Sequence, residues 1–127
     1  MVDSWKNDAI SLVEAFRSGE RNPKDETQAV LSAIEKSSLN AFSYIDKEGA
    51  LLRAENADVS LPLGGVPIAV KELHNVDGWP DTGASLVFKD RISQFDGTMI
   101  QRLKAAGANL IGLTTASEFG GLNCATT

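Results

Sequence analysis

Cysteine and histidine are almost missing from this sequence of 127 residues, which contains one of each, Cys124 and His74. A single cysteine cannot form an intrachain disulfide, so an intracellular compartment is the default expectation. The spaced cysteine and histidine ligands of a zinc site are also lacking. A histidine-based triad would have to use His74, yet no Gly-x-Ser-x-Gly turn supplies its serine. We therefore expect an exposed loop histidine and an inert thiol.

Positive charge and long apolar runs are scarce too. The formal net charge is −5 and the basic residues are scattered, which disfavours nucleic acid and anionic membranes as partners because both select basic surfaces. The sequence starts without the apolar core of a signal peptide. Its longest uncharged apolar stretch, residues 66–70, is too short to cross a bilayer. The sequence predicts a soluble protein with a cytoplasmic location.

The amino-terminal half is predicted to be helical. Apolar residues recur at helical spacing over residues 5–16, and Gly19 is suited to end that helix. Asn22-Pro23 predicts the start of a second helix, because asparagine caps and proline fits the first turn. Residues 41–45 have strand character, and residues 47–57 predict a third helix.

Glycine becomes frequent after Val59, since nine of the eleven glycines lie from Gly64 onward. Short apolar runs there predict a buried strand at residues 66–70 and another strand at 109–113. Between them, residues 96–106 predict a helix that Gly107 closes. A strand, a helix and a strand in this order predict an α/β fold with neighbouring parallel strands.

Lys71, directly after the first of these strands, is the strongest candidate for chemistry. Side chains alternate along a strand, so Lys71 shares a face with Pro67 and Ala69, whereas Glu72 points to the other face. The apolar run before Lys71 predicts burial, and a low dielectric favours the neutral amine. A neutral amine can act as the base of a Ser–Lys hydrolase. The alternative, favoured by position alone, is a lysine that reaches into solvent.

Other polar residues lack a visible base in the sequence and are expected to serve as turn or cap residues. This group comprises Ser85, Thr114, Thr115 and Ser117. Asp81 and Glu118 could form a carboxylate pair, but nothing local favours that. No phosphate-binding glycine pattern occurs either. Local chemistry alone predicts an α/β domain without a defined function.

Four pieces of the second half together resemble the amidase signature family. In order, they are residues 62–73, with the lysine and strand; 78–85, a Gly-x-Pro-x-Thr loop; 102–108, a helix end; and 115–120, a Thr-x-x-x-Glu-Phe segment. With their spacing they cover residues 61–127 almost continuously. The sequence departs from the family at Glu72, where aspartate is frequent, and at Leu113, where lysine is common.

The resemblance implies that residues 1–127 are the amino-terminal part of a single amidase domain. Residues 1–60 would be its helical segment and 61–127 the start of the signature core. Amino-terminal helices followed by strand, loop, helix and strand would contribute to a mixed sheet covered by helices. The Gly- and Ser-rich segment with the two serines of the family is expected beyond Thr127, in a carboxy-terminal remainder.

The resemblance implies amide hydrolysis by a Ser-cis-Ser-Lys triad through an acyl-enzyme. Lys71 is then the one catalytic residue in this sequence, and the 127-residue chain alone is expected to be inactive. A small-molecule amide substrate is implied, without a cofactor, a metal or a membrane. Gly83, Ser85, Thr115 and Glu118 match the family pattern and are interpreted as structural supports.

Two alternatives stay open. The catalytic component of tRNA-dependent glutamyl/aspartyl amidotransferases shares the signature, and that function would require partner subunits and an ammonia channel. Residues around Trp79 and in 115–121 slightly favour a stand-alone amidase. A non-catalytic remnant of the fold is the other alternative. An unpaired sheet edge and an uncovered apolar face would favour association of the isolated chain, so a homo-oligomer also stays open.

Overall fold

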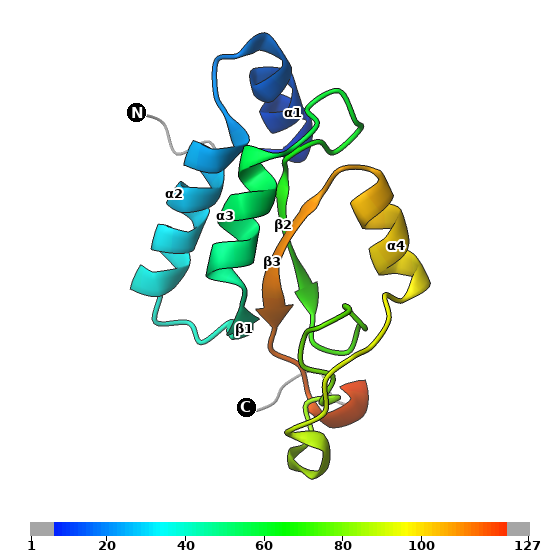
Figure 1. Ribbon diagram of the computed structural model, residues 1–127. Helices are drawn as coiled ribbons and strands as arrows, with labels where there is room; N and C mark the ends of the chain where they lie inside the picture. Colours follow the sequence, from blue (N-terminus) through cyan, green and yellow to red (C-terminus); the bar gives the residue numbers. More distant parts are fainter. Residues whose placement is uncertain (1–6, 122–127) are drawn as a thin grey trace. The chain divides into compact units, whose positions relative to one another are not determined.

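The computed structural model describes residues 7–121, which form α-helices, β-strands and short 3-10 helices (Figure 1). They divide into two compact units that interleave along the chain. Unit 1 comprises residues up to Ser38, Asp46–Ile68 and Leu103–Ile111. Unit 2 comprises Leu39–Ile45, Ala69–Arg102 and residues from Gly112 onward. Each unit is described by itself.

Three helices begin in unit 1, each at a side-chain cap, and they are α1 (Ala9–Ser18), α2 (Pro23–Lys36) and α3 (Lys47–Glu55). A capping oxygen accepts the backbone N–H three residues later, which satisfies one of the free donors of the first turn. The pairs are Asp8 with Ser11 at 2.8 Å, Asn22 with Asp25 at 2.9 Å and Asp46 with Gly49 at 3.2 Å. Gly19 ends α1 at φ 79°. The predicted end at Gly19 and start at Asn22-Pro23 are confirmed.

Apolar side chains of these helices form the core of unit 1. Leu12, Val13 and Phe16 of α1 pack with Val66. Leu31 of α2 and Ala50 of α3 are almost completely buried, and the two helices lie alongside one another (Figure 1). The sequence did not predict that α2 would also bury Glu26 and Thr27.

The sheet has three strands in the order β1-β3-β2, which are β1 (Phe42–Ile45), β3 (Asn109–Thr114) and β2 (Pro67–Lys71). β1 runs antiparallel to β3. Hydrogen bonds from Asn109 N–H to Val66 O and from Glu72 N–H to Thr114 O, both 2.9 Å, advance in the same direction along both strands. β2 and β3 are therefore parallel, and the predicted mixed sheet of an α/β fold is confirmed.

Between β2 and β3 the chain forms a long loop and then α4 (Thr98–Ala105). The loop contains the 3-10 helix η2 (Leu86–Phe88), and a second one, η3 (Glu118–Gly120), follows β3. Glycine is required at Gly112, because a Cβ there would lie 2.3 Å from the backbone oxygen of Tyr44 in the neighbouring β1. Within residues 7–121, no helix combines the length and apolar character that crossing a membrane requires.

Candidate functional site

Lys71 is the last residue of β2, and its side chain is exposed. The predicted burial of this lysine is therefore wrong for the described residues. Strand alternation gives the physical reason: Ala69 and Lys71 lie on an uncovered face, whereas Val70 and Glu72 lie on the buried face. The predicted buried strand at residues 66–70 is likewise covered on one side only. Within residues 7–121, no hydrogen bond or ion pair engages the Lys71 ammonium.

The backbone around Lys71 is held firmly although its side chain is free. The Lys71 carbonyl accepts the N–H of His74 at 3.0 Å, and the Glu72 N–H donates to Thr114 O at 2.9 Å. Both polar groups of the peptide that follows Lys71 are thus bonded. Because this peptide fixes the Cα–Cβ direction of Lys71, the amine has a defined point of departure from the sheet.

Glu72 is the buried polar neighbour of Lys71, and the sequence analysis did not identify its role. Only 6% of the residue is exposed, and its carboxylate oxygen Oε1 accepts the backbone N–H of Ala116 at 2.7 Å. Strand alternation correctly predicted that Glu72 points away from Lys71. An acidic residue on the covered face of a strand needs a buried donor, and this requirement was the available signal.

The Gly-x-Pro-x-Thr loop and the Thr-x-x-x-Glu-Phe segment are joined by two hydrogen bonds. Ser85 Oγ donates to Glu118 Oε1 at 2.7 Å, and Phe119 N–H donates to Gly83 O at 2.8 Å. Gly83 has φ 60°, and a Cβ there would come within 3.0 Å of the Phe119 ring. Thr115 N–H donates to Ala41 O at 2.9 Å. These contacts agree with the interpretation of the four family-pattern residues as structural supports.

Asp81 and Glu118 do not act on a common partner in the structure. Asp81 forms an ion pair with Arg91 at 3.2 Å, and its backbone oxygen accepts Arg91 Nε at 2.6 Å. The Arg91 guanidinium also lies 4.1 Å from the centre of the Phe88 ring. Since Glu118 binds Ser85, the two carboxylates are engaged separately, and the contacts give no support to a catalytic pair.

The remaining sequence candidates offer little chemistry. His74 is half-buried rather than exposed as expected. Trp79 is buried and packs its ring against Tyr44, with 5.4 Å between the ring centres. Cys124 lies outside the described residues. In the part of the chain that the structure describes, no group of three or more His, Cys, Asp or Glu side chains could hold a metal ion.

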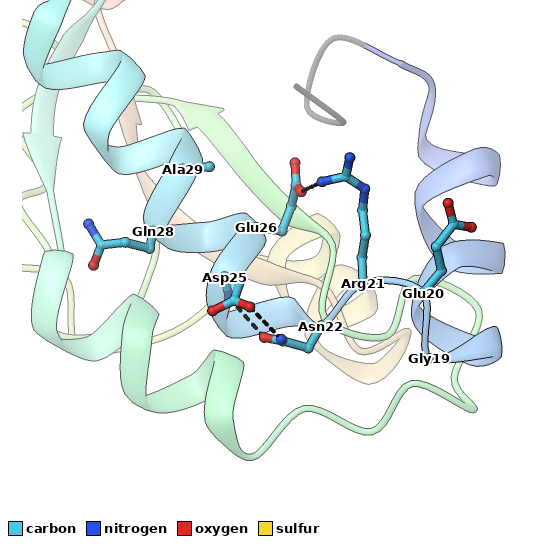
Figure 2. Close-up of a pocket in the computed structure, with 8 residues that line it drawn as sticks. All are labelled: Gly19, Glu20, Arg21, Asn22, Asp25, Glu26, Gln28 and Ala29. Carbon is cyan, nitrogen blue, oxygen red and sulfur yellow. Dashed lines mark hydrogen bonds and ion pairs between the residues drawn. The ribbon is translucent and has the colours of Figure 1, made fainter. Parts of the chain in front are cut away.

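A surface pocket of about 430 Å³ lies in unit 1, where α1 ends and α2 begins (Figure 2). Its lining does not include Lys71. Figure 2 shows that Arg21 and Glu26 point toward one another, 3.6 Å apart, and that Asn22 and Asp25 are joined by two hydrogen bonds. The Asn22–Asp25 pair caps α2, so we assign this contact a structural role. The pocket is lined by Gly19, Glu20, Arg21, Asn22, Asp25, Glu26, Gln28 and Ala29.

Comparison with known sequences matches this arrangement to one family. The sequence model of the family described as Amidase covers residues 25–126. The A-type component of the glutamyl-tRNA(Gln) amidotransferase of Methylacidiphilum infernorum (isolate V4) is 46% identical over 79 residues, which are 62% of this chain and 16% of that protein. The protein of the same description from Bordetella avium (strain 197N) is 37% identical over 116 residues, 87% of this chain and 21% of that one.

Solved structures give the same fold. A 6-aminohexanoate cyclic dimer hydrolase complexed with substrate superposes with a TM-score of 0.83 at 27% identity, over 93% of this chain and 25% of that chain. The peptide amidase PAM in complex with the competitive inhibitor chymostatin superposes with a TM-score of 0.82 at 26% identity, over 91% of this chain and 26% of that chain. The chain thus spans between 16% and 26% of the length of these relatives.

Proposed function

Because this chain belongs to the amidase family, we propose that it provides the general base, Lys71, of an amide-bond hydrolase. The observation that carries the proposal is the place of Lys71: the end of a parallel strand, after the family's lysine-bearing segment, on the uncovered face of the sheet. Amide hydrolases of this fold are among its structural neighbours. The substrate we propose is a small-molecule amide.

In the proposed mechanism, a neutral Lys71 takes the proton of a bridging serine, which in turn takes the proton of a nucleophilic serine. The nucleophile attacks the amide carbonyl, and backbone N–H groups stabilise the oxyanion. Ammonia or an amine leaves, and water then hydrolyses the acyl-enzyme. Both serines are proposed to lie in sequence that follows Thr127, in a remainder of the amidase domain.

The exposure of Lys71 makes a specific demand on that remainder. A fully hydrated ammonium is a poor base, because water stabilises the charged form. We propose that the remainder covers the face of β2 that carries Ala69 and Lys71, excluding water from the amine. Amide hydrolysis then requires more than residues 1–127.

The proposal is tested by expressing the complete gene product and comparing it with its Lys71→Ala variant. General acid–base groups contribute about 10²- to 10⁴-fold to rate, and we expect a loss of this size in the hydrolysis of a panel of acyl p-nitroanilides and primary amides. Lys47, an exposed lysine on α3, gives a matched control, Lys47→Ala. Equal activity of the Lys71→Ala variant and the unsubstituted protein would refute the proposal, as would hydrolysis by residues 1–127 alone for the demand on the remainder.

A second candidate function is that of an amidotransferase component, and the sequence relatives favour it specifically. The two relatives described above are the A-type components of glutamyl-tRNA(Gln) amidotransferases. In this case, the same Lys71 chemistry would release ammonia for transfer, and partner subunits with an ammonia channel would be needed. The hydrolytic step is common to both candidates.

Native purification of the tagged gene product from its own cells separates the two candidates. An amidotransferase component is expected to co-purify in stoichiometric amounts with other subunits, and its amide hydrolysis should depend on them. A stand-alone amidase should retain full activity after purification to a single polypeptide. Full activity of the single polypeptide would exclude the amidotransferase candidate.

A further inference from the structure

We propose that Glu72 is a positioning residue for Lys71, acting through its hydrogen bond to the backbone N–H of Ala116. The inference rests on the proposed role of Lys71 as the general base. Glu72 itself points away from Lys71 and contacts the segment that follows β3. Its effect on the base would therefore pass through the backbone rather than through direct contact between the side chains.

The contact between Glu72 and Ala116 has the character of a strong hydrogen bond. A distance of 2.7 Å between carboxylate oxygen and amide nitrogen is typical of bonds in which the acceptor is charged. Both partners are buried. A buried carboxylate without a donor is costly, and so is a buried N–H without an acceptor, so each group constrains the other.

Glu72 also binds the neighbouring segment at two points. Its backbone N–H donates to Thr114 O, and its side chain accepts from Ala116, two residues further along. This double attachment holds residue 72 against the end of β3. Since the peptide between Lys71 and Glu72 is also bonded through the Lys71 carbonyl to His74, the main chain on the carboxyl side of the base is fixed at every polar group.

Side-chain length is the decisive variable in this arrangement. The family often has aspartate after the lysine, whereas this sequence has Glu72. Aspartate is shorter by one methylene, roughly 1.5 Å, which is as long as the N–Cα bond. In this chain, aspartate would lose the bond to Ala116 or pull the Thr115–Ser117 backbone toward β2. A shift of about 1 Å in a catalytic group can reduce a rate by about 10²-fold.

The experiment uses the complete gene product and a fluorescent fluorophosphonate, which labels an activated serine without requiring the natural substrate. The serine oxygen forms a bond to phosphorus, fluoride leaves, and the hydroxyl proton passes to the base. We would measure the maximal labelling rate, the half-saturating probe concentration and the pH profile. The variants are Lys71→Ala, Glu72→Ala, Glu72→Asp and Glu72→Gln, with Glu48→Gln, an exposed site on α3, as a matched control.

Positioning predicts a particular order of rates, expressed per folded molecule. Glu72→Gln keeps the length and an acceptor oxygen, so its maximal rate should stay within about 3-fold, with the acidic limb of the pH profile unmoved. Glu72→Asp and Glu72→Ala should lose about 10- to 100-fold in maximal rate at a little-changed half-saturating concentration. Hydrogen exchange of the Ala116 amide should accelerate in these two variants alone.

Each contrary result has a distinct meaning. Labelling that survives Lys71→Ala, or no labelling of the unsubstituted protein, would overturn the proposed function and this inference with it. Loss of labelling in Lys71→Ala, together with an unchanged rate in Glu72→Ala, would overturn the inference alone. It would also be overturned if Glu72→Asp retained the rate while Glu72→Gln lost it and moved the acidic limb to lower pH, because charge rather than position would then matter.

Discussion

Units 1 and 2 differ in how completely their own residues satisfy them. Of the twelve large apolar side chains that are exposed within residues 7–121, ten lie in unit 2. The three non-glycine residues with positive φ in this range, Asn40, Ala84 and Phe119, also lie there. Unit 1 instead has three capped helices around a core of its own.

The difference coincides with the division of chemistry along the chain. Lys71, the Glu72–Ala116 bond and the Ser85–Glu118 bond are all in unit 2. Clustered exposed apolar side chains commonly mark surfaces that bind another part of a protein, and strained backbone gathers at functional sites. We infer that unit 1 is stabilised mainly by its own contacts, whereas the candidate site in unit 2 depends on further sequence.

A matched pair of leucine substitutions tests this contrast with the largest expected effect. Leu31→Ala in unit 1 removes a side chain that is 2% exposed, whereas Leu86→Ala in unit 2 removes one that is 86% exposed. We expect the first to lower the free energy of unfolding by about 2–5 kcal/mol, through lost burial and a cavity. The second should stay within about 0.5 kcal/mol. Urea unfolding of residues 1–127, followed by circular dichroism, would measure both.

The same pair in the complete gene product sharpens the contrast. If further sequence covers η2, Leu86→Ala should become destabilising there while Leu31→Ala keeps its cost. An equal, small effect of Leu86→Ala in both proteins would contradict the inference that unit 2 binds further sequence.

Ser85→Ala tests the bond between the two loops of unit 2. The Ser85 hydroxyl donates to Glu118 and accepts the N–H of Val87 at 3.3 Å. Because Glu118 is exposed and can be hydrated instead, we expect a loss of about 1–2 kcal/mol, below that of Leu31→Ala. Thermal melts would measure the loss. Ser85→Thr, which retains a hydroxyl, is the control, and it should recover part of the stability.

Ala84→Gly should have the opposite sign. Ala84 has φ 59°, in a region that disfavours residues with a Cβ by about 1–2 kcal/mol. Glycine removes this strain but gains freedom in the unfolded chain, which costs roughly 0.5–1 kcal/mol. A net stabilisation of about 0.5 kcal/mol is therefore expected in a urea titration. Destabilisation would show that the Ala84 methyl group makes contacts that outweigh the strain.

The sequence predicted local structure better than it predicted the surroundings of the site. Caps and breakers act within a few residues, and for this reason Gly19 and Asn22-Pro23 placed the helix ends correctly. Strand alternation likewise placed Lys71 and Glu72 on opposite faces. The burial of Lys71 was predicted wrongly, because burial depends on what covers a strand, and an apolar run cannot show that. The partners of Glu72 and Ser85 are 44 and 33 residues away, beyond any periodic pattern.

The smallest predicted effect is the acid response of two carboxylates in unit 1, Asp8 and Asp58. The backbone N–H of Ser11 lowers the pKa of Asp8 below its ordinary value of 3.8, and the Ser60 side chain does the same for the pKa of Asp58. A pKa that is lower in the folded state stabilises the fold above 3.8, and this contribution disappears as the pH falls through the folded-state value. Both groups are fully solvated, so the change should be slight. Urea midpoints between about pH 5 and pH 2 should fall less steeply in an Asp8→Asn, Asp58→Asn double variant, since asparagine accepts the same bonds without titrating. An unchanged slope would mean that acid destabilises the chain at other carboxylates, and the contribution of these two caps to unit 1 would have to be revised.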